Sequence, residues 1–233
     1  MSHAVTDLAH FEPRALPGAE PIEGRHVRVE PIVDERRFDE LYDAFAADRS
    51  GRIFDYLAYG PFGDRAAFLE FAREIYLGGA MRFHAMVPAS TGRATGVAAL
   101  MRADPANGVI EIGHICLAPS LQQTVASTEA LFLIVRRAID ELGYRRLEWK
   151  CDDRNLPSRR AAERLGFRYE GTFRQHMIVK NRNRDTAWFS ILDSEWPALR
   201  GGFEEWLEPE NFEPSGRQIR RLEDVRAALG DRT

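Results

Sequence analysis

The passage from residue 109 to residue 142 places the tightest constraint on how this chain can fold. Residues 109–117 are predicted as a strand, Pro119 ends it, and a long helix with a broad apolar face follows over about residues 124–142. A strand that leads into a helix N-terminus brings free backbone N–H groups and the positive end of the helix dipole together. The passage therefore predicts an anion site, with an ordinary helix cap as the alternative reading.

The other segments alternate between strand and helix patterns. Strands are predicted at residues 26–31, 82–87, 94–101, 146–151 and 167–170, followed by a hairpin of residues 173–180 and 185–192. Helices are predicted after Asp34 as the N-cap, over residues 64–77 and 157–165, and from Ser194 onward. This order predicts a mixed α/β fold.

The chain has 233 residues, enough for one well-buried domain with short extensions. Residues 1–23 carry prolines without periodicity and are predicted as an irregular arm. Residues 24–200 are predicted as the domain and residues 201–233 as a C-terminal helical extension. That extension packs on the domain or on a second subunit, so a homodimer is left open.

Charge and composition exclude several classes of protein. The net charge of −4 provides no overall positive field for nucleic acid, which is therefore not an expected partner. No apolar run approaches the roughly 20 residues that span a bilayer, so no membrane association is expected. The two cysteines, Cys116 and Cys151, lie far apart, which predicts no metal site, no disulfide framework and a reducing cytoplasmic location.

A second informative passage opens with Asn155 and Ser158 and closes on Leu165-Gly166-Phe167. Together with the stretch from Gln122 to Ser127, it resembles the GNAT superfamily of N-acyltransferases over about residues 25–195, with the RimJ/RimL-like branch the most similar. The resemblance implies the GNAT-like acyl-CoA N-acyltransferase fold. That fold has a mixed, mostly antiparallel sheet flanked by helices, with two central strands splayed apart.

The resemblance also implies acetyl-CoA as co-substrate and no metal. Pantetheine contacts carry over to Ile115, Cys116 and Leu117, and pyrophosphate contacts to Gln122, Gln123, Thr124, Val125, Ala126, Ser127 and Thr128, with Asn155 and Ser158 beside the cofactor. Val125 stands where the family usually has glycine, and a β-branched residue resists positive φ. We therefore expect the helix to begin one turn earlier, with Val125 in helical geometry.

Amine acylation requires a base, because a protonated amine has no lone pair. The resemblance makes Glu111 the first candidate, with an exposed strand residue as its alternative role. His114 is the second candidate, with a core histidine as its alternative; it should face away from Glu111 unless a bulge intervenes. Ala162 replaces the tyrosine that many relatives use near the leaving thiolate, so Ser158 is the candidate partner of that sulfur, or only a polar residue of the first helical turn.

The resemblance implies transfer of an acetyl group from acetyl-CoA to a primary amine, by direct attack in a ternary complex. A protein N-terminus, an amino acid, a polyamine and an aminoglycoside all fit as acceptors. Succinyl-CoA is the alternative donor if a basic side chain meets its carboxylate. The rival interpretation is a non-catalytic acyl-CoA-binding or regulatory module, since fold resemblance does not establish activity.

Overall fold

A computed structural model describes residues 8–79 and 81–230, and one eight-stranded sheet forms their centre, in the order β1-β2-β3-β4-β5-β6-β8-β7. Neighbouring strands are antiparallel except for β5 and β6, which run parallel. The strands are β1 (Ile22–Glu23), β2 (Val27–Pro31), β3 (Arg82–Pro88), β4 (Gly96–Asp104), β5 (Val109–Leu117), β6 (Arg146–Asp152), β7 (Arg168–Val179) and β8 (Arg182–Leu192). The prediction of a mixed, mostly antiparallel sheet is confirmed.

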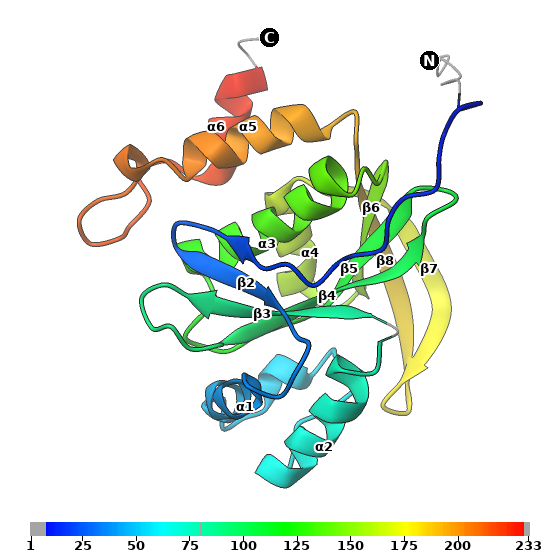
Figure 1. Cartoon of the computed structure of the whole chain (residues 1–233), viewed down its shortest axis with the longest axis vertical. Helices are drawn as coiled ribbons and strands as arrows, with labels where there is room; N and C mark the ends of the chain where they lie inside the picture. The colour runs from blue at the N-terminus through cyan, green and yellow to red at the C-terminus, as the bar shows by residue number, and fades with distance from the viewer. Residues whose placement is uncertain (1–7, 80, 231–233) are drawn as a thin grey trace.

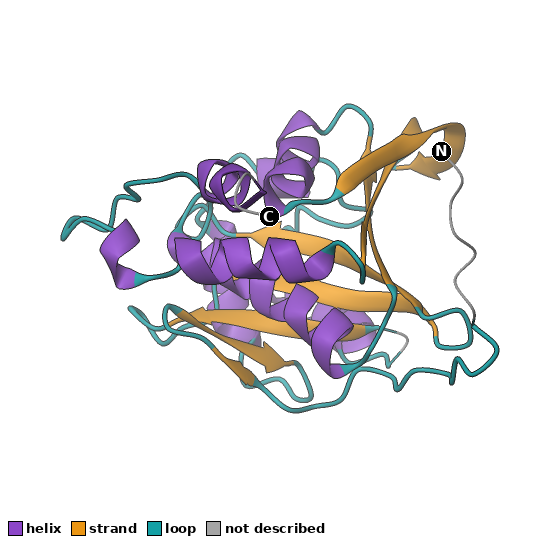
Figure 2. Ribbon diagram, turned by 90° about the horizontal axis from the view of Figure 1, so that it is seen from above, coloured by secondary structure: helices purple, strands orange, loops and turns teal. Residues whose placement is uncertain are grey.

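Helices cover both faces of the sheet (Figures 1 and 2). The helices are α1 (Phe38–Ala46), α2 (Arg65–Tyr76), α3 (Val125–Arg136), α4 (Leu156–Leu165), α5 (Trp196–Trp206) and α6 (Leu222–Gly230). In Figure 1, α1 and α2 lie below the sheet, whereas α3 and α4 lie on its other face, with α5 and α6 beyond them. Two apolar cores result: the larger one surrounds α3, and the smaller one lies between the sheet and the helices α1 and α2.

The first two helices form because their apolar side chains recur at helical spacing. In α2, Phe68, Ala72 and Tyr76 lie four residues apart and are all buried. Burying a side chain as large as Phe68 contributes about 1.5–3 kcal/mol. Asp64, at which the helix was predicted to begin, is the N-cap of α2, and its carboxylate accepts from the backbone N–H of Ala67.

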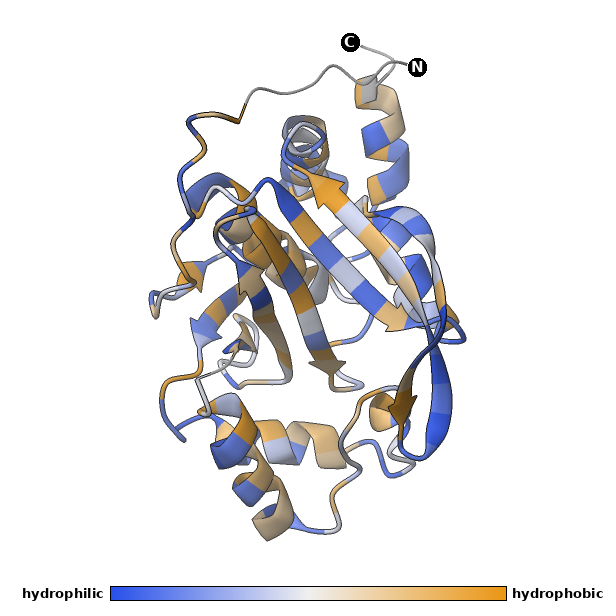
Figure 3. Ribbon diagram, turned by 90° about the vertical axis from the view of Figure 1, so that its right-hand side faces the viewer, coloured by the Kyte–Doolittle hydropathy of each residue, from blue (hydrophilic) through white to orange (hydrophobic). Residues whose placement is uncertain are grey.

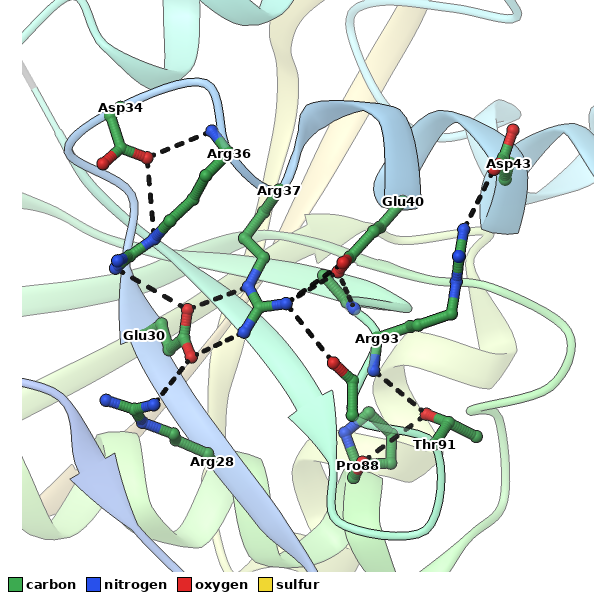
Figure 4. A network of polar contacts seen from close by, with 12 residues as sticks. Arg28, Glu30, Asp34, Arg36, Arg37, Glu40, Asp43, Pro88, Thr91 and Arg93 are labelled. Atoms are coloured by element: carbon green, nitrogen blue, oxygen red, sulfur yellow. Dashed lines mark hydrogen bonds and ion pairs between the residues drawn. The ribbon is translucent and has the colours of Figure 1, made fainter.

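The start of α1 differs from the prediction. Arg37, and not Asp34, is the N-cap residue, and the helix begins at Phe38. The reason is an ion-pair network in which the guanidinium of Arg37 binds Glu30 of β2 (2.9 Å) and Glu40 of α1 (3.0 Å) (Figure 4). Glu30 is buried, and the Arg37 hydrogen bond lowers its pKa. The network attaches α1 to the sheet.

The long helix predicted over residues 124–142 is present in two parts. Helix α3 ends at Arg136 and continues as a π-helical turn, Arg137–Glu141. Gly143 ends the segment with a positive φ of 73°, as its glycine predicts. The apolar surface of α3 is broad because nearly every residue of this helix is buried in the structure, so it needs apolar side chains on most of its circumference.

The strand after α4 is longer than predicted. Residues 168–179 form one strand, β7, and not two separate segments, because bulges at residues 169–171 and 173–177 bend it while keeping it paired with β8. The β7–β8 hairpin extends from the sheet toward the α1–α2 side (Figure 1). At its tip, Lys180 donates a 2.8 Å hydrogen bond to the carbonyl oxygen of Phe54.

The terminal segments pack on the same chain. Helix α6 contributes Leu222 and Val225 to the core around α5, so the C-terminal segment packs on its own domain. In the arm before β1, the carbonyl oxygen of Ala15 accepts from the Tyr144 hydroxyl. Residues 1–7 of the predicted arm lie outside the described residues. The boundaries at residues 23 and 200 stay a proposal, and α5 spans the second of them.

Candidate active site

The open edge of β5 is the first element of the candidate site. The parallel pairing between β5 and β6 ends at Ile112 and Trp149, although β5 continues to Leu117 and β6 to Asp152. Beyond that point β6 pairs with β8 only, so the two central strands splay apart. The part of β5 that no longer pairs with β6 includes Ile115, Cys116 and Leu117, although it still pairs with β4 on its other edge. Their backbone is available on the β6 side to an extended ligand.

The first turn of α3 is the second element. Thr124 is the N-cap, and its hydroxyl accepts from the N–H of Ser127. Val125 is the first helical residue, as predicted, so its β-branched side chain meets no conformational conflict. The left-handed backbone position falls instead on Gln123, with φ 59°. Among the described residues, no group accepts a hydrogen bond from the N–H of Val125 or Ala126, which leaves both for an anion.

A cavity borders this helix start. Its volume is about 260 Å³, and its lining includes Thr124, Val125 and Ala126 together with Arg25, whose guanidinium also donates to the Leu207 carbonyl oxygen. Gln122 closes the preceding turn by donating from Nε2 to the Leu117 carbonyl oxygen at 3.0 Å. Open amides, a helix dipole and a nearby arginine together suit a phosphate group.

His114 lies at a bulge in β5. The register with β4 shifts between the Gly113 and Cys116 pairs, and His114 adopts a positive φ of 50°. Its ring stacks on Tyr59 at 5.6 Å, on the same side of the sheet as α1 and α2. Glu111, which pairs with Met101 of β4, points to this same side of the sheet. Without the bulge, His114 would face the opposite side, so the bulge places both candidate bases on one face.

The imidazole of His114 is mostly shielded, and burial lowers its pKa, while the charge of Glu111 raises it. Its Nδ1 is buried and has no hydrogen-bond partner within the described part of the chain. A neutral imidazole with an unused nitrogen can accept a proton from a substrate.

Glu111 is buried rather than exposed, contrary to its alternative role. Its Oε2 accepts from Lys150 Nζ at 2.8 Å and from Arg102 Nη1 at 2.9 Å. The carboxylate is therefore held by two cations, in a cluster that also contains Glu148, 2.7 Å from the same lysine. Such a cluster orients the carboxylate and fits either a base or a structural ion pair.

Ser158 lies in the first turn of α4, across the splay from β5. Asn155 is the N-cap of this helix and accepts from the N–H of Ser158, so Ser158 itself is not the cap. The Ser158 hydroxyl oxygen accepts from the Trp149 indole N–H at 3.0 Å. Its own O–H reaches the Cys151 thiol, so this hydroxyl already interacts with one sulfur and can act as a donor to a thiolate. Ala162 is fully buried at the position of the missing tyrosine.

Both cysteines are free and buried. Burial raises the pKa of the Cys116 and Cys151 thiols, which disfavours a nucleophilic thiolate.

A cytoplasmic location stays a prediction. No group of three or more metal-ligating side chains occurs among the residues that the structure describes. Within those residues, no helix has the length and apolar character to cross a bilayer.

Lys150 and Trp188 lie on β6 and β8 beside Glu111 and were not predicted as site residues, because strand alternation alone did not single them out. Arg184 belongs to the cluster of residues 180–185, for which the sequence left open a rim of the acceptor cleft that attracts an acidic substrate, or a solvent-exposed hairpin tip. A hollow of about 780 Å³ lies on the adjacent hairpin and is lined by Phe173, Arg174, Gln175, His176, Asn183 and Asp185. Tyr59 packs among the rings of Phe62 and Phe71, and it also stacks on His114.

Comparisons with known proteins agree with this geometry. The family model of the acetyltransferase (GNAT) domain matches residues 27–168, more than half of the chain. This chain belongs to the GNAT acetyltransferase family. A crystal structure of a GCN5-related N-acetyltransferase from Brucella melitensis is similar, with 47% identity, a TM-score of 0.92, and coverage of 94% of this chain and 100% of that chain.

Two curated proteins of Bacillus subtilis are similar over part of their length. The uncharacterized N-acetyltransferase YnaD is 30% identical over 37% of this chain and 50% of its own length. YdaF, whose name provisionally assigns it to ribosomal N-acetylation, is 30% identical over 45% of this chain and 57% of its own length. The chain thus spans about half the length of these relatives, and the YdaF match is consistent with the RimJ/RimL-like branch.

Proposed function

We propose that the protein transfers an acetyl group from acetyl-CoA to a primary amine, by direct attack in a ternary complex. The observation that carries this proposal is the open edge of β5 next to the free N–H groups at the start of α3. An extended chain with amide groups fits the first feature, and a pyrophosphate fits the second.

The residues that would hold the donor follow from this arrangement. Backbone groups of Ile115, Cys116 and Leu117 would bind pantetheine, and residues 122–128 would bind the pyrophosphate. Asn155 and Ser158 start α4 on the opposite side of the splay. The bound donor would supply an activated acyl carbon. The protein would contribute the positions of the two substrates and the groups that transfer protons.

The amine proton would go to His114, whose shielded Nδ1 is free, or to Glu111, whose Oε1 has no hydrogen bond to the described residues. The neutral nitrogen would then attack the acyl carbon, the new C–N bond would replace the C–S bond, and the departing CoA thiolate would take up the second proton that the nitrogen loses when it becomes an amide. The Ser158 O–H would donate a hydrogen bond to that sulfur, while its oxygen accepts from the Trp149 indole. A protein N-terminal amine is one candidate acceptor, since the name of YdaF refers to ribosomal N-acetylation.

Calorimetric titration with acetyl-CoA, followed by thiol release against an amine panel, tests the proposal. We expect saturable binding and thiol release that depends on an amine. Binding without thiol release from any amine would instead support a non-catalytic acyl-CoA-binding module. Absence of binding would contradict both functions.

A further inference from the structure

The β6–β8 surface beside Glu111 carries an aromatic and cationic platform. Lys150 and Trp188 are register partners, and the Lys150 ammonium lies 3.9 Å from the centroid of the Trp188 ring. Phe173 packs on the same ring at 4.7 Å, and His176 lies 6.0 Å from it. Figure 3 shows how hydrophobic and hydrophilic residues alternate along the strands, so this polar face lies opposite the apolar residues of the main core.

The acidic groups of this face are already neutralised. Three carboxylates have cationic partners: Glu111 with Arg102 and Lys150, Glu148 with Lys150 and Arg146, and Asp152 with Arg154. Each of these contacts has the length of a charge-assisted hydrogen bond, between 2.7 and 2.9 Å. A further cation on this face therefore forms no ion pair with these three carboxylates.

Arg184 is that further cation. It lies on β8 at even spacing from Thr186 and Trp188, so the three side chains share one face. Its side chain has no ion pair and no hydrogen bond to the described residues, and its Nε is shielded from solvent. The indole Nε1 of Trp188 is likewise shielded and has no partner there. A shielded donor without a partner costs free energy, which a ligand acceptor would recover.

We propose that Arg184 binds a carboxylate of the substrate, with the Trp188 indole N–H as a second donor on the same face. A guanidinium presents paired N–H groups that match the two oxygens of a carboxylate. This inference rests on the proposed function and names the chemical class of its substrate.

The position of Arg184 connects the carboxylate to the reaction. Burial lowers the pKa of Arg184, and the charges of Asp152 and, more weakly, Glu111 raise it. Burial also lowers the pKa of His114, Glu111 raises it, and Arg102 and Arg184 lower it further. These groups therefore lie within electrostatic reach of one another. A carboxylate held at Arg184 would place the rest of the substrate beside the two candidate bases.

Two parts of the substrate can supply this carboxylate. One is the acyl chain of a dicarboxylic donor such as succinyl-CoA, and the other is the amine acceptor, as in an amino acid or an acidic peptide N-terminus. Polyamines and aminoglycosides fit poorly, because Arg184, Lys150 and Arg102 would repel additional positive charge.

Crossed kinetics on purified full-length protein separate the two sources. In the donor arm, acetyl-CoA is compared with succinyl-CoA. In the acceptor arm, amino acids and acidic peptides are compared with their carboxamide analogues. We expect kcat/KM to favour the carboxylate in one arm by about 10- to 100-fold. Arg184→Gln should abolish that preference, Arg184→Lys should retain part of it, and Arg182→Gln, an exposed arginine of the same strand, should leave it unchanged.

The outcomes also separate this inference from the proposed function. Acyl transfer without a carboxylate preference in either arm, or an equal loss for charged and neutral substrates in Arg184→Gln, overturns the carboxylate site alone. If no acyl transfer occurs with any pair, the same ligands are compared by calorimetric binding. Equal affinity of wild type and Arg184→Gln for every carboxylate ligand then overturns the inference as well.

Discussion

The ammonium group of Lys150 lies 2.8 Å from Oε2 of Glu111, and both side chains are almost fully buried, at 7% and 5% exposed. Glu111 lies in the section of β5 that pairs with β6, and Lys150 is the residue of β6 directly after the last pair, where the two strands begin to splay. The contact therefore fixes the carboxylate next to the point where the proposed donor enters. It also makes the role of Glu111 testable against that of its neighbour Glu148.

Replacing Glu111 with Gln keeps the shape of the side chain and removes its charge. If Glu111 accepts the amine proton, kcat should fall by about 100-fold or more with little change in acetyl-CoA affinity. Steady-state kinetics and calorimetric titration measure the two quantities. Glu148→Gln is the matched control, because it removes the other carboxylate bound to Lys150. An equal loss in both variants would assign Glu111 a structural role.

His114 should determine the acidic limb of the rate profile. Burial lowers the pKa of His114, so the ring stays neutral at a lower pH than an exposed histidine does. If it is the base, kcat/KM should fall only below about pH 6.5, as the ring becomes protonated. His114→Gln should lower kcat/KM by about 100-fold or more and remove this limb. An unchanged profile in the variant would exclude His114 as the base.

Ser158→Ala tests the thiolate partner. The helix cap belongs to Asn155, so this change should leave α4 formed and should slow turnover by about tenfold or more. The Trp149 indole loses its acceptor, which costs about 1–3 kcal/mol of folding free energy. Asn155→Ala is the comparison, with a cap loss of about 1 kcal/mol. Thermal unfolding and thiol release measure both variants, and a wild-type rate for Ser158→Ala would remove it from the mechanism.

Val125→Gly tests the departure from the family loop. Val125 is the first residue of α3 and packs against the main core, so glycine should destabilise the fold by about 0.5–1 kcal/mol. Acetyl-CoA affinity should change by less than about threefold, because the N–H groups stay in helical geometry. Calorimetric titration measures it. Binding that tightens by tenfold would show that the valine side chain obstructs the phosphates.

His84 should make stability depend on pH. It is fully buried, and burial lowers its pKa to about 3, from the usual value near 6.5. Between these two values the unfolded chain binds a proton that the folded chain does not, so stability falls as the pH decreases from about 6.5 toward 3. The contribution is about 1.4 kcal/mol per pH unit.

Denaturant unfolding of wild type and His84→Leu over this pH range tests the contribution. The difference in unfolding free energy between the two proteins should grow as the pH falls, because leucine does not titrate. His10→Gln, at an exposed position, should follow the wild type. Parallel curves for wild type and His84→Leu would contradict the assignment.

Local sequence signals predicted most of the elements because their causes are local. Asp64 and Asn155 cap helices with their own side chains, and Gly143 ends a helix by adopting a positive φ. The start of α1 was mispredicted because Arg37 binds Glu30 on another element, a contact that residue spacing does not reveal. The continuous strand β7 was divided in the prediction because its bulges interrupt the alternation that identifies a strand.

The sequence alone determined the order of the elements and the helix start after β5 that is the predicted anion site, since these depend on residue type and short spacing. Its resemblance to the family supplied the candidates Glu111 and Ser158, and residue type added His114. Only the tertiary structure decided which of these groups share a face. The bulge at His114 turns its ring to the side of Glu111, and strand pairing brings Lys150 to Glu111 across 39 positions. The role proposed for Arg184 also depends on the tertiary structure. Only the paired strands show that its Nε has no hydrogen-bond partner among the described residues.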